Sequence, residues 1–393
     1  MRVCGVICEY NPFHKGHQYH LARARALTDA DYVICVMSGA LTQRGAFARH
    51  DKWTRAKMAL SCGADLVLEL PARFAAAPAP DFARGGVKTL EGLGVVTHLS
   101  FGCEGDALPH LERAAAALKE ESPAFKQLLR EGLDQGLPYP RARALALQAA
   151  CGADNLADLI AAPNAALALE YLAALPEGVA AVPIVREGTG YHDAQLTALS
   201  SATAVRAALE GNQLENALAA VPCPDLLGEA EARGDIHVPD ALDTALLARL
   251  RVMTPEALRT VYGMDEGLEH RFLAAARTAA TRDELIHAVK SKRYTYARLS
   301  RLCAYILLGL TRDFAAAHAE PAYARVLGFR CEAAPLLGAI KKSGTLPLVT
   351  KVADYEHPLF ALDLRAQDLW ALGCASPALR KSGRDYTTSP IIL

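Results

Sequence analysis

One junction near the start of the chain constrains the fold more than any other feature. Over residues 3–20 an apolar strand pattern runs into the motif Glu-Tyr-Asn-Pro-Phe-His-Lys-Gly-His, residues 9–17, and then into a helical pattern. Ligands of open α/β sheets bind at the carboxyl ends of the strands, and a helix N-terminus attracts phosphate. The junction therefore predicts a phosphate-binding site at the edge of an α/β sheet.

Strand and helix patterns alternate after this junction. Apolar runs that read as buried strands cover residues 3–9, 32–37, 66–70, 97–101 and 180–186. Their alternation with amphipathic helices predicts a Rossmann-like, parallel, doubly wound sheet. After Gly211 nearly all patterns are helical, apart from a short strand near 346–352. We therefore expect an α/β domain over 1–210 and a mainly helical, basic region over 211–393.

Bulk properties exclude several classes of protein. The 393 residues contain no apolar run long enough to cross a membrane and no leader-like segment. The ten cysteines form no CxxC pair, so we expect free thiols and no metal site. These features predict a protein of the cytoplasm.

The net charge of −1 hides a strong asymmetry. Residues 290–351 contain eleven Lys and Arg but three Asp and Glu, which favours a polyanion-binding face. Cations interleaved with Tyr294 and Tyr296 suit single-stranded RNA, although a solvated helix face is the usual explanation of such a run. The candidate RNA-binding residues are Lys290, Lys292, Arg293, Arg298 and Arg301, and the surplus continues through Arg325, Arg330, Lys341, Lys342 and Lys351.

The two imidazoles of the junction suit nucleotidyl transfer. This reaction must stabilise extra negative charge on the α-phosphate, and donors at a helix N-terminus reach that charge without reorganising. His14 and His17 are such donors, and Gly16 allows close approach of the backbone. A coincidental pair or a weak metal site is the alternative. Because no third ligand lies nearby, we prefer the phosphate interpretation.

A second candidate phosphate cradle lies at Ser200, Ser201, Thr203 and Arg206. Its hydroxyls and free N–H groups could bind the β- and γ-phosphates, with Arg206 adding charge. A plain helix N-cap explains the same residues equally well.

Other segments lie at the same predicted sheet edge. Ser38-Gly39 follows the second strand, Gly102 follows the fourth, Arg186 ends the fifth, and Asn164 begins a helix. Each could contact a ligand, and ordinary turns and caps are the alternative.

The basic segment that follows the second strand has two interpretations. Arg44, Lys52 and Arg55 could hold anions, and a solvated helix face explains the same residues.

Together these residues resemble the bacterial tRNA(Met) cytidine acetate ligase family, a branch of the HIGH-type nucleotidyltransferases. The resemblance covers nearly the whole chain and lies in residues 9–17, 37–39, 43–45, 51–53, 63–71, 101–102, 163–164, 201–203, 266–269 and 292–295.

The resemblance implies an ATP-dependent ligase with a HIGH-type nucleotidyltransferase domain over 1–210 and a tRNA-binding region over 211–393. Such an enzyme activates acetate as acetyl-adenylate, releases pyrophosphate and transfers the acetyl group to N4 of the wobble cytidine of elongator tRNA(Met). It implies that His14 and His17 are catalytic and that acetate lies near Ser38 and Gly39. We also expect Mg²⁺ to bridge the triphosphate, with no protein carboxylate assigned to it. The ATP-binding positions carried over are Ile7, Cys8, Glu9, Tyr10, Asn11, Pro12, Phe13, His14, Lys15, Gly16, His17, Gln18, Tyr19, His20, Gly102, Asn164 and Arg186.

Two segments depart from the family pattern. Residues 40–42 read Ala-Leu-Thr where the family has Asn-Phe-Val, and Ala46-Phe47 replaces Glu-Pro, which leaves the acyl-group preference open. Two other functions compete with the ligase. A small-molecule adenylyl- or cytidylyltransferase would not need a large basic helical half. A non-catalytic RNA-binding protein would not need an intact His14, Gly16 and His17.

Overall fold

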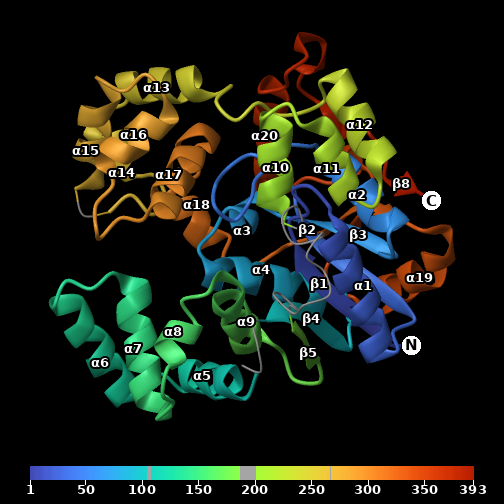
Figure 1. The fold of residues 1–393 in the computed structure, drawn as a ribbon, viewed down its shortest axis with the longest axis horizontal. Helices are drawn as coiled ribbons and strands as arrows, with labels where there is room; N and C mark the ends of the chain where they lie inside the picture. Colours follow the sequence, from blue (N-terminus) through green and yellow to red (C-terminus); the bar gives the residue numbers. More distant parts are fainter. Residues whose placement is uncertain (104–107, 186–200, 266) are drawn as a thin grey trace.

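A mixed eight-stranded sheet lies at the centre of the molecule (Figure 1). The structure, a computed structural model, describes residues 1–103, 108–185, 201–265 and 267–393. Five strands run parallel in the order β5-β4-β1-β2-β3, which confirms the predicted Rossmann-like sheet. Their bounds are β1 Val3–Cys8, β2 Tyr32–Ser38, β3 Leu66–Leu70, β4 His98–Cys103 and β5 Ala180–Val185. The strand order reverses between β1 and β4, where ligands of this fold bind.

Alternate residues of the strands face two separate cores. One core packs β1 to β4 against α4 and α9, while the other packs β1 to β3 against α1, α2 and α10 to α12. The helices up to β5 are α1 Lys15–Thr28, α2 Lys52–Ser61, α3 Ala72–Ala75, α4 Ala79–Glu91, α5 Leu108–Glu120, α6 Pro123–Asp134, α7 Tyr139–Cys151, α8 Leu156–Leu159 and α9 Pro163–Ala174.

A third core lies in the predicted helical half. In this core the helices α13, α15, α16 and α17 pack together with α20. In Figure 1 the helices α13 to α18 form a lobe beside the sheet. The helices of this half are α10 Ala202–Glu210, α11 Leu214–Ala220, α12 Pro224–Arg233, α13 Asp243–Val252, α14 Pro255–Arg259, α15 Leu268–Ala276, α16 Arg282–Val289, α17 Tyr296–Leu308, α18 Arg312–Ala317, α19 Ala334–Ser343, α20 Pro358–Leu372 and α21 Arg384–Thr387. Among the described residues, no helix is long and apolar enough to span a membrane.

The C-terminal half also extends the sheet. Strand β6 (Ala324–Phe329) pairs antiparallel with β3, and β7 (Leu348–Val349) and β8 (Ile391–Ile392) pair with β6. The short strand expected near 346–352 is therefore confirmed, whereas β6 lay outside the predicted strands. The division into domains at residue 210 stays a prediction.

Four buried charges lie where the two halves meet. Lys52 Nζ lies 2.9 Å from Glu69 and 2.7 Å from Asp385, and the Arg325 guanidinium lies 3.1 Å and 2.5 Å from the same two carboxylates. None of these side chains is more than 4% exposed. They connect α2, β3, β6 and α21, and two cations balance two anions. We call them the buried ion cluster.

The cluster corrects two expectations about cations. Lys52 binds two carboxylates of the protein itself, so it neither holds a ligand anion nor lies on a solvated face, and the buried Arg325 is not available to RNA. The rest of the basic surplus is dispersed. Arg330 and Lys351 pair with neighbouring carboxylates, and Lys341 and Lys342 lie on α19, on the opposite side of the molecule from α16 and α17 (Figure 1). These later positions of the basic surplus therefore do not extend the surface formed by α16 and α17.

The cluster predicts a large cost for removing one charge. Lys52→Ala leaves Glu69 and Asp385 with one cation, so we expect it to lower the free energy of unfolding by about 3–5 kcal/mol, measured by urea denaturation. Lys57→Ala removes an exposed lysine from the same helix and should change it by less than about 0.5 kcal/mol. Equal effects of the two substitutions would contradict this account.

Candidate active site

The two histidines of the first junction cap helix α1. His14 is the N-cap residue, its Nδ1 accepts the Gly16 N–H at 3.1 Å, and His17 Nδ1 accepts the His14 N–H at 3.2 Å. The two rings lie 3.7 Å apart between centroids. Because Nδ1 of each ring accepts a hydrogen bond, the proton of each neutral imidazole is placed on Nε2. The cap thus orients two Nε2–H donors at the N-terminus of a helix.

The motif lies at the reversal of the strand order. His20 Nε2 lies 3.2 Å from Ser100 Oγ, which links α1 to β4. Gly102 lies near the end of β4 and Asn164 in the first turn of α9, so the structure brings both to the same edge as the histidines. Arg186 and Ser200 fall outside the described residues.

Helix α10 packs its first turns against this motif. The Ser201 hydroxyl accepts the Ala204 N–H at 3.1 Å, so this residue is an N-cap. Arg206 donates to the Asn11 carbonyl at 2.5 Å and to Thr203 Oγ1 at 3.2 Å. The structure therefore brings the second predicted phosphate cradle to the first.

Arg55 organises the strand ends from inside the protein. Its fully buried guanidinium donates to the carbonyls of His50 at 3.1 Å, Glu9 at 2.6 Å, Ser38 at 2.9 Å and Gly39. Burial lowers its pKa to about 10, so the group stays charged at neutral pH. Arg55 is thus a structural cation, and both sequence interpretations of it were wrong.

The same network buries Ser38 and Gly39, the predicted acetate residues. A Cβ atom at Gly39 would overlap the carboxylate of Glu69, so this glycine allows β2 to pass close to the buried ion cluster. Neither residue lines the cavity described next, and their role toward acetate stays a prediction.

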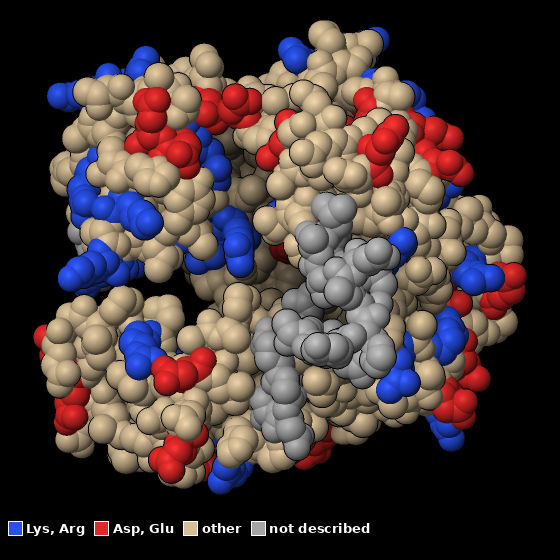
Figure 2. Space-filling model, in the orientation of Figure 1, with Lys and Arg blue, Asp and Glu red and all other residues tan. Residues whose placement is uncertain are grey.

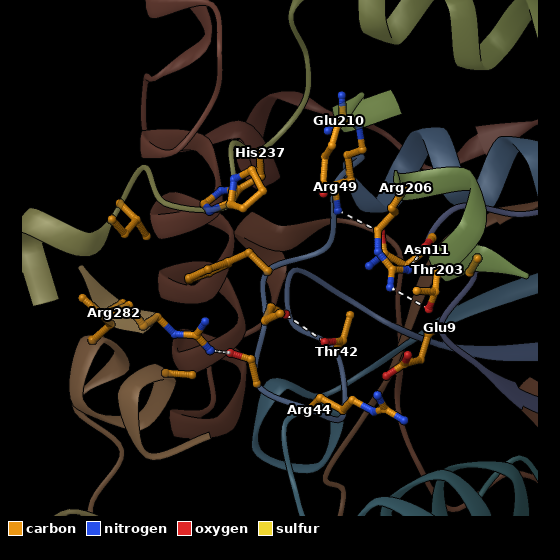
Figure 3. A pocket seen from close by; sticks show the side chains of 18 of the residues that line it. Glu9, Asn11, Thr42, Arg44, Arg49, Thr203, Arg206, Glu210, His237 and Arg282 are labelled. Carbon is orange, nitrogen blue, oxygen red and sulfur yellow. Dashed lines mark hydrogen bonds between the residues drawn. The ribbon is translucent and has the colours of Figure 1, made fainter. Parts of the chain in front are cut away.

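A cavity of about 390 Å³ opens beside the first motif (Figure 3). It is within the range of roughly 300–1,000 Å³ typical of small-molecule sites. Near the motif, its wall is polar and includes Glu9, Asn11, Thr203 and Arg206. The C-terminal half supplies another part of the wall, including His237, Pro239, Leu242, Asp243, Arg282, Ala304 and Leu307. The cavity thus joins the two halves of the chain.

A tight hairpin over residues 40–48 forms one side of the cavity. The Thr42 N–H donates to the Ala46 carbonyl at 2.8 Å, and Gly45 has a φ of +78°. The hairpin tip rests on α17, where Ser300 Oγ donates to the Arg44 carbonyl at 2.6 Å. A Cβ atom at Gly45 would lie 2.6 Å from the Arg301 Cα, so both the backbone angle and the close approach require glycine here.

Comparisons with known proteins agree with this geometry. The sequence matches the HIGH Nucleotidyl Transferase family over residues 1–385. Proteins named tRNA(Met) cytidine acetate ligase from Acetivibrio thermocellus and Syntrophomonas wolfei are 38% and 36% identical; the matches cover all of this chain and 100% and 99% of theirs. A crystal structure of Thermotoga maritima TmcAL bound with alpha-thio ATP matches with a TM-score of 0.93 and 32% identity over all of both chains. This chain belongs to the tRNA(Met) cytidine acetate ligase family.

The RNA-binding candidates of this family member lie on the turn between α16 and α17 and on α17 itself. Lys290, Lys292 and Arg293 are exposed, and Figure 2 shows Lys and Arg side chains gathered over the lobe of α13 to α18. Arg298 is partly exposed and lies 3.9 Å from Asp265. Arg301 lies deeper, within 3.4 Å of the Gln43 carbonyl, and burial lowers its pKa.

The two tyrosines of this segment differ in accessibility. Tyr294 is buried, so it cannot stack on a base as the sequence suggested. Tyr296 is exposed, and its hydroxyl donates to Asp283 at 3.0 Å. Of these two tyrosines, Tyr296 is therefore the one that can stack on an RNA base.

Several residues that line the cavity were not predicted from the sequence. His237 stacks on Phe47 with centroids 4.6 Å apart, and burial lowers its pKa to about 4. Asp243 accepts the Arg282 N–H at 2.8 Å. None of these residues belongs to a local motif, so only the folded chain reveals them.

Arg55 generates a prediction that separates stability from catalysis. Lysine cannot reach four carbonyls, so Arg55→Lys should lower the free energy of unfolding by about 2–4 kcal/mol. It should also slow ATP–pyrophosphate exchange about tenfold or more at a temperature where the variant is folded, because the motif shifts. Arg23→Lys on the exposed side of α1 is the control. Unchanged exchange in folded Arg55→Lys would show that Arg55 does not position the site.

Proposed function

We propose that this protein is an ATP-dependent tRNA(Met) cytidine acetate ligase. It activates acetate as acetyl-adenylate and transfers the acetyl group to N4 of the wobble cytidine of elongator tRNA(Met). The observation that carries the proposal is the reciprocal cap of His14 and His17 at the strand-order reversal, in a chain whose full-length relatives bear this name.

In the first step an acetate oxygen attacks the α-phosphate and pyrophosphate leaves. The Nε2–H groups of His14 and His17 and the N-terminus of α1 stabilise the charge that develops on the phosphate. Thr203 and Arg206 lie where they can bind the outer phosphates. Mg²⁺ accompanies ATP and, as is usual for this ion, would bind through phosphates and water rather than through a protein cage.

The tRNA is held by the exposed cations before and on α17. These cations lie before and on α17, whose Ser300 supports the 40–48 hairpin beside the cavity. This arrangement favours RNA binding next to the cavity. An anticodon loop suits such a site because its bases are unpaired.

ATP–pyrophosphate exchange with and without acetate tests this proposal. We expect exchange that depends on acetate, followed by transfer of labelled acetate to elongator tRNA(Met). Exchange that needs no acetate would contradict the ligase and favour a small-molecule nucleotidyltransferase. Tight tRNA binding with no exchange would favour a non-catalytic RNA-binding protein.

The paired imidazoles predict a selective loss of the first step. His14→Ala and His17→Ala should each reduce exchange by about a hundredfold or more, while tRNA binding stays within about twofold of the native value. Filter binding and the exchange assay measure the two quantities. Loss of both together would indicate misfolding rather than a catalytic role.

The exposed cations predict the opposite selectivity. Charge reversal at Arg293 and Arg298 should raise the Kd for tRNA and flatten its dependence on salt concentration, with exchange retained. Charge reversal at Lys341 and Lys342 changes as many charges on α19 and should leave the Kd near its native value. An equal effect of both pairs would contradict this assignment of the RNA-binding surface.

A further inference from the structure

Glu9 is chemically unusual in a site that binds a polyphosphate. It follows β1 directly and lines the cavity, and its Oε1 accepts the backbone N–H of Gln43. A carboxylate beside the phosphates of ATP repels them, so a nucleotide site alone does not explain an acidic residue here. A carboxylate can, however, accept a hydrogen bond from an amino group.

The surroundings of Glu9 raise its pKa above the ordinary value of a carboxyl group. Burial raises its pKa, and the cations Arg55 from α2, Arg206 from α10 and Arg44 from the hairpin oppose that rise. The hydroxyl of Tyr171 from α9 also interacts electrostatically with Glu9. A carboxylate with a raised pKa is a stronger base than an exposed one.

The cavity has room for a base beyond Glu9. Away from the motif, its wall includes Phe47, Pro239, Leu242 and Leu307, and Phe47 is stacked on His237. Unpaired RNA bases bind by stacking on such aromatic surfaces and by hydrogen bonds to their edges. Carboxylates are the usual partners of the N4 amino group of cytosine.

We propose that the acceptor cytosine enters this cavity and that Glu9 binds its N4 amino group and removes a proton during acetyl transfer. This inference rests on the proposed function. In the step, the N4 lone pair attacks the acetyl carbonyl and forms a C–N bond. The C–O bond to phosphate breaks, AMP leaves with the electron pair, and the N4 proton goes to Glu9. The exocyclic amine of cytosine is a weak nucleophile because the ring delocalises its lone pair. A base that removes its proton would therefore speed the attack.

The other polar groups of the cavity are less suited to this role. Asp243 lies in the part of the wall that the C-terminal half supplies, away from the first motif. His237 lies against the Trp370 carbonyl at 2.9 Å, and burial lowers its pKa. Glu210 is the last residue of α10 and is exposed to solvent. Glu9 alone among these four belongs to the motif that carries His14 and His17.

Single-turnover transfer from synthetic acetyl-adenylate to elongator tRNA(Met) tests the role of Glu9. In Glu9→Gln we expect transfer to fall about a hundredfold or more, and by a larger factor than acetate-dependent exchange. In the native enzyme the transfer rate should rise with pH through the pKa of Glu9 and then level, and this limb should vanish in Glu9→Gln. Glu210→Gln removes an equal charge from the same cavity and should keep the limb.

The outcomes separate this inference from the proposed function. No transfer by the native enzyme would refute the ligase itself. Native transfer with Glu9→Gln as fast as Glu210→Gln would refute the role of Glu9 alone, and so would equal losses of exchange and transfer in Glu9→Gln. If Glu9→Gln does not fold, Glu9→Asp should still show the pH limb at a reduced transfer rate, and its absence would overturn the inference.

Discussion

The guanidinium of Arg55 lies where the carboxyl ends of β1 and β2 meet, and it binds backbone carbonyls from both strands and from the segment before α2. Three of these carbonyls lie at the ends of the two strands, and buried carbonyls of this kind need a donor. One planar cation with five N–H groups satisfies them together. The first motif and the start of the 40–48 hairpin therefore leave the sheet in fixed directions, and the candidate active site depends on that.

The 40–48 hairpin connects the ends of β1 and β2 to the C-terminal half. Its tip rests on α17 through Ser300 and Gly45, while Gln43 in the same tip donates to Glu9. The cavity is consequently shaped by both halves, and the helix that bears the RNA-binding candidates also supports its wall. In the ligase proposed here, this continuity would place the RNA acceptor beside the adenylate without a separate acyl-transfer domain.

Much of this architecture was predictable because it is locally encoded. Strands β1 to β5 are buried apolar runs, and their predicted bounds agree with the structure within about two residues. The motif at residues 9–17 was also recognisable, because its histidines and glycine lie next to each other in the sequence. Buried cations were not predictable, since Lys52, Arg55 and Arg325 look like surface residues until distant carboxylates and carbonyls surround them. Strand β6 escaped prediction because its partner, β3, lies more than 250 residues away in the chain. The cavity residues His237 and Asp243 escaped for the same reason.

The central claim is that one chain forms an acyl-adenylate and passes the acyl group to RNA. Acetate labelled with ¹⁸O tests it most directly, because attack by acetate on the α-phosphate leaves an acetate oxygen on the phosphate of AMP. With ATP, labelled acetate and elongator tRNA(Met), the account predicts ¹⁸O in the AMP and an equal amount of acetylated wobble cytidine, both measured by mass spectrometry. Label in orthophosphate with formation of ADP, or acetylated tRNA with unlabelled AMP, would contradict it.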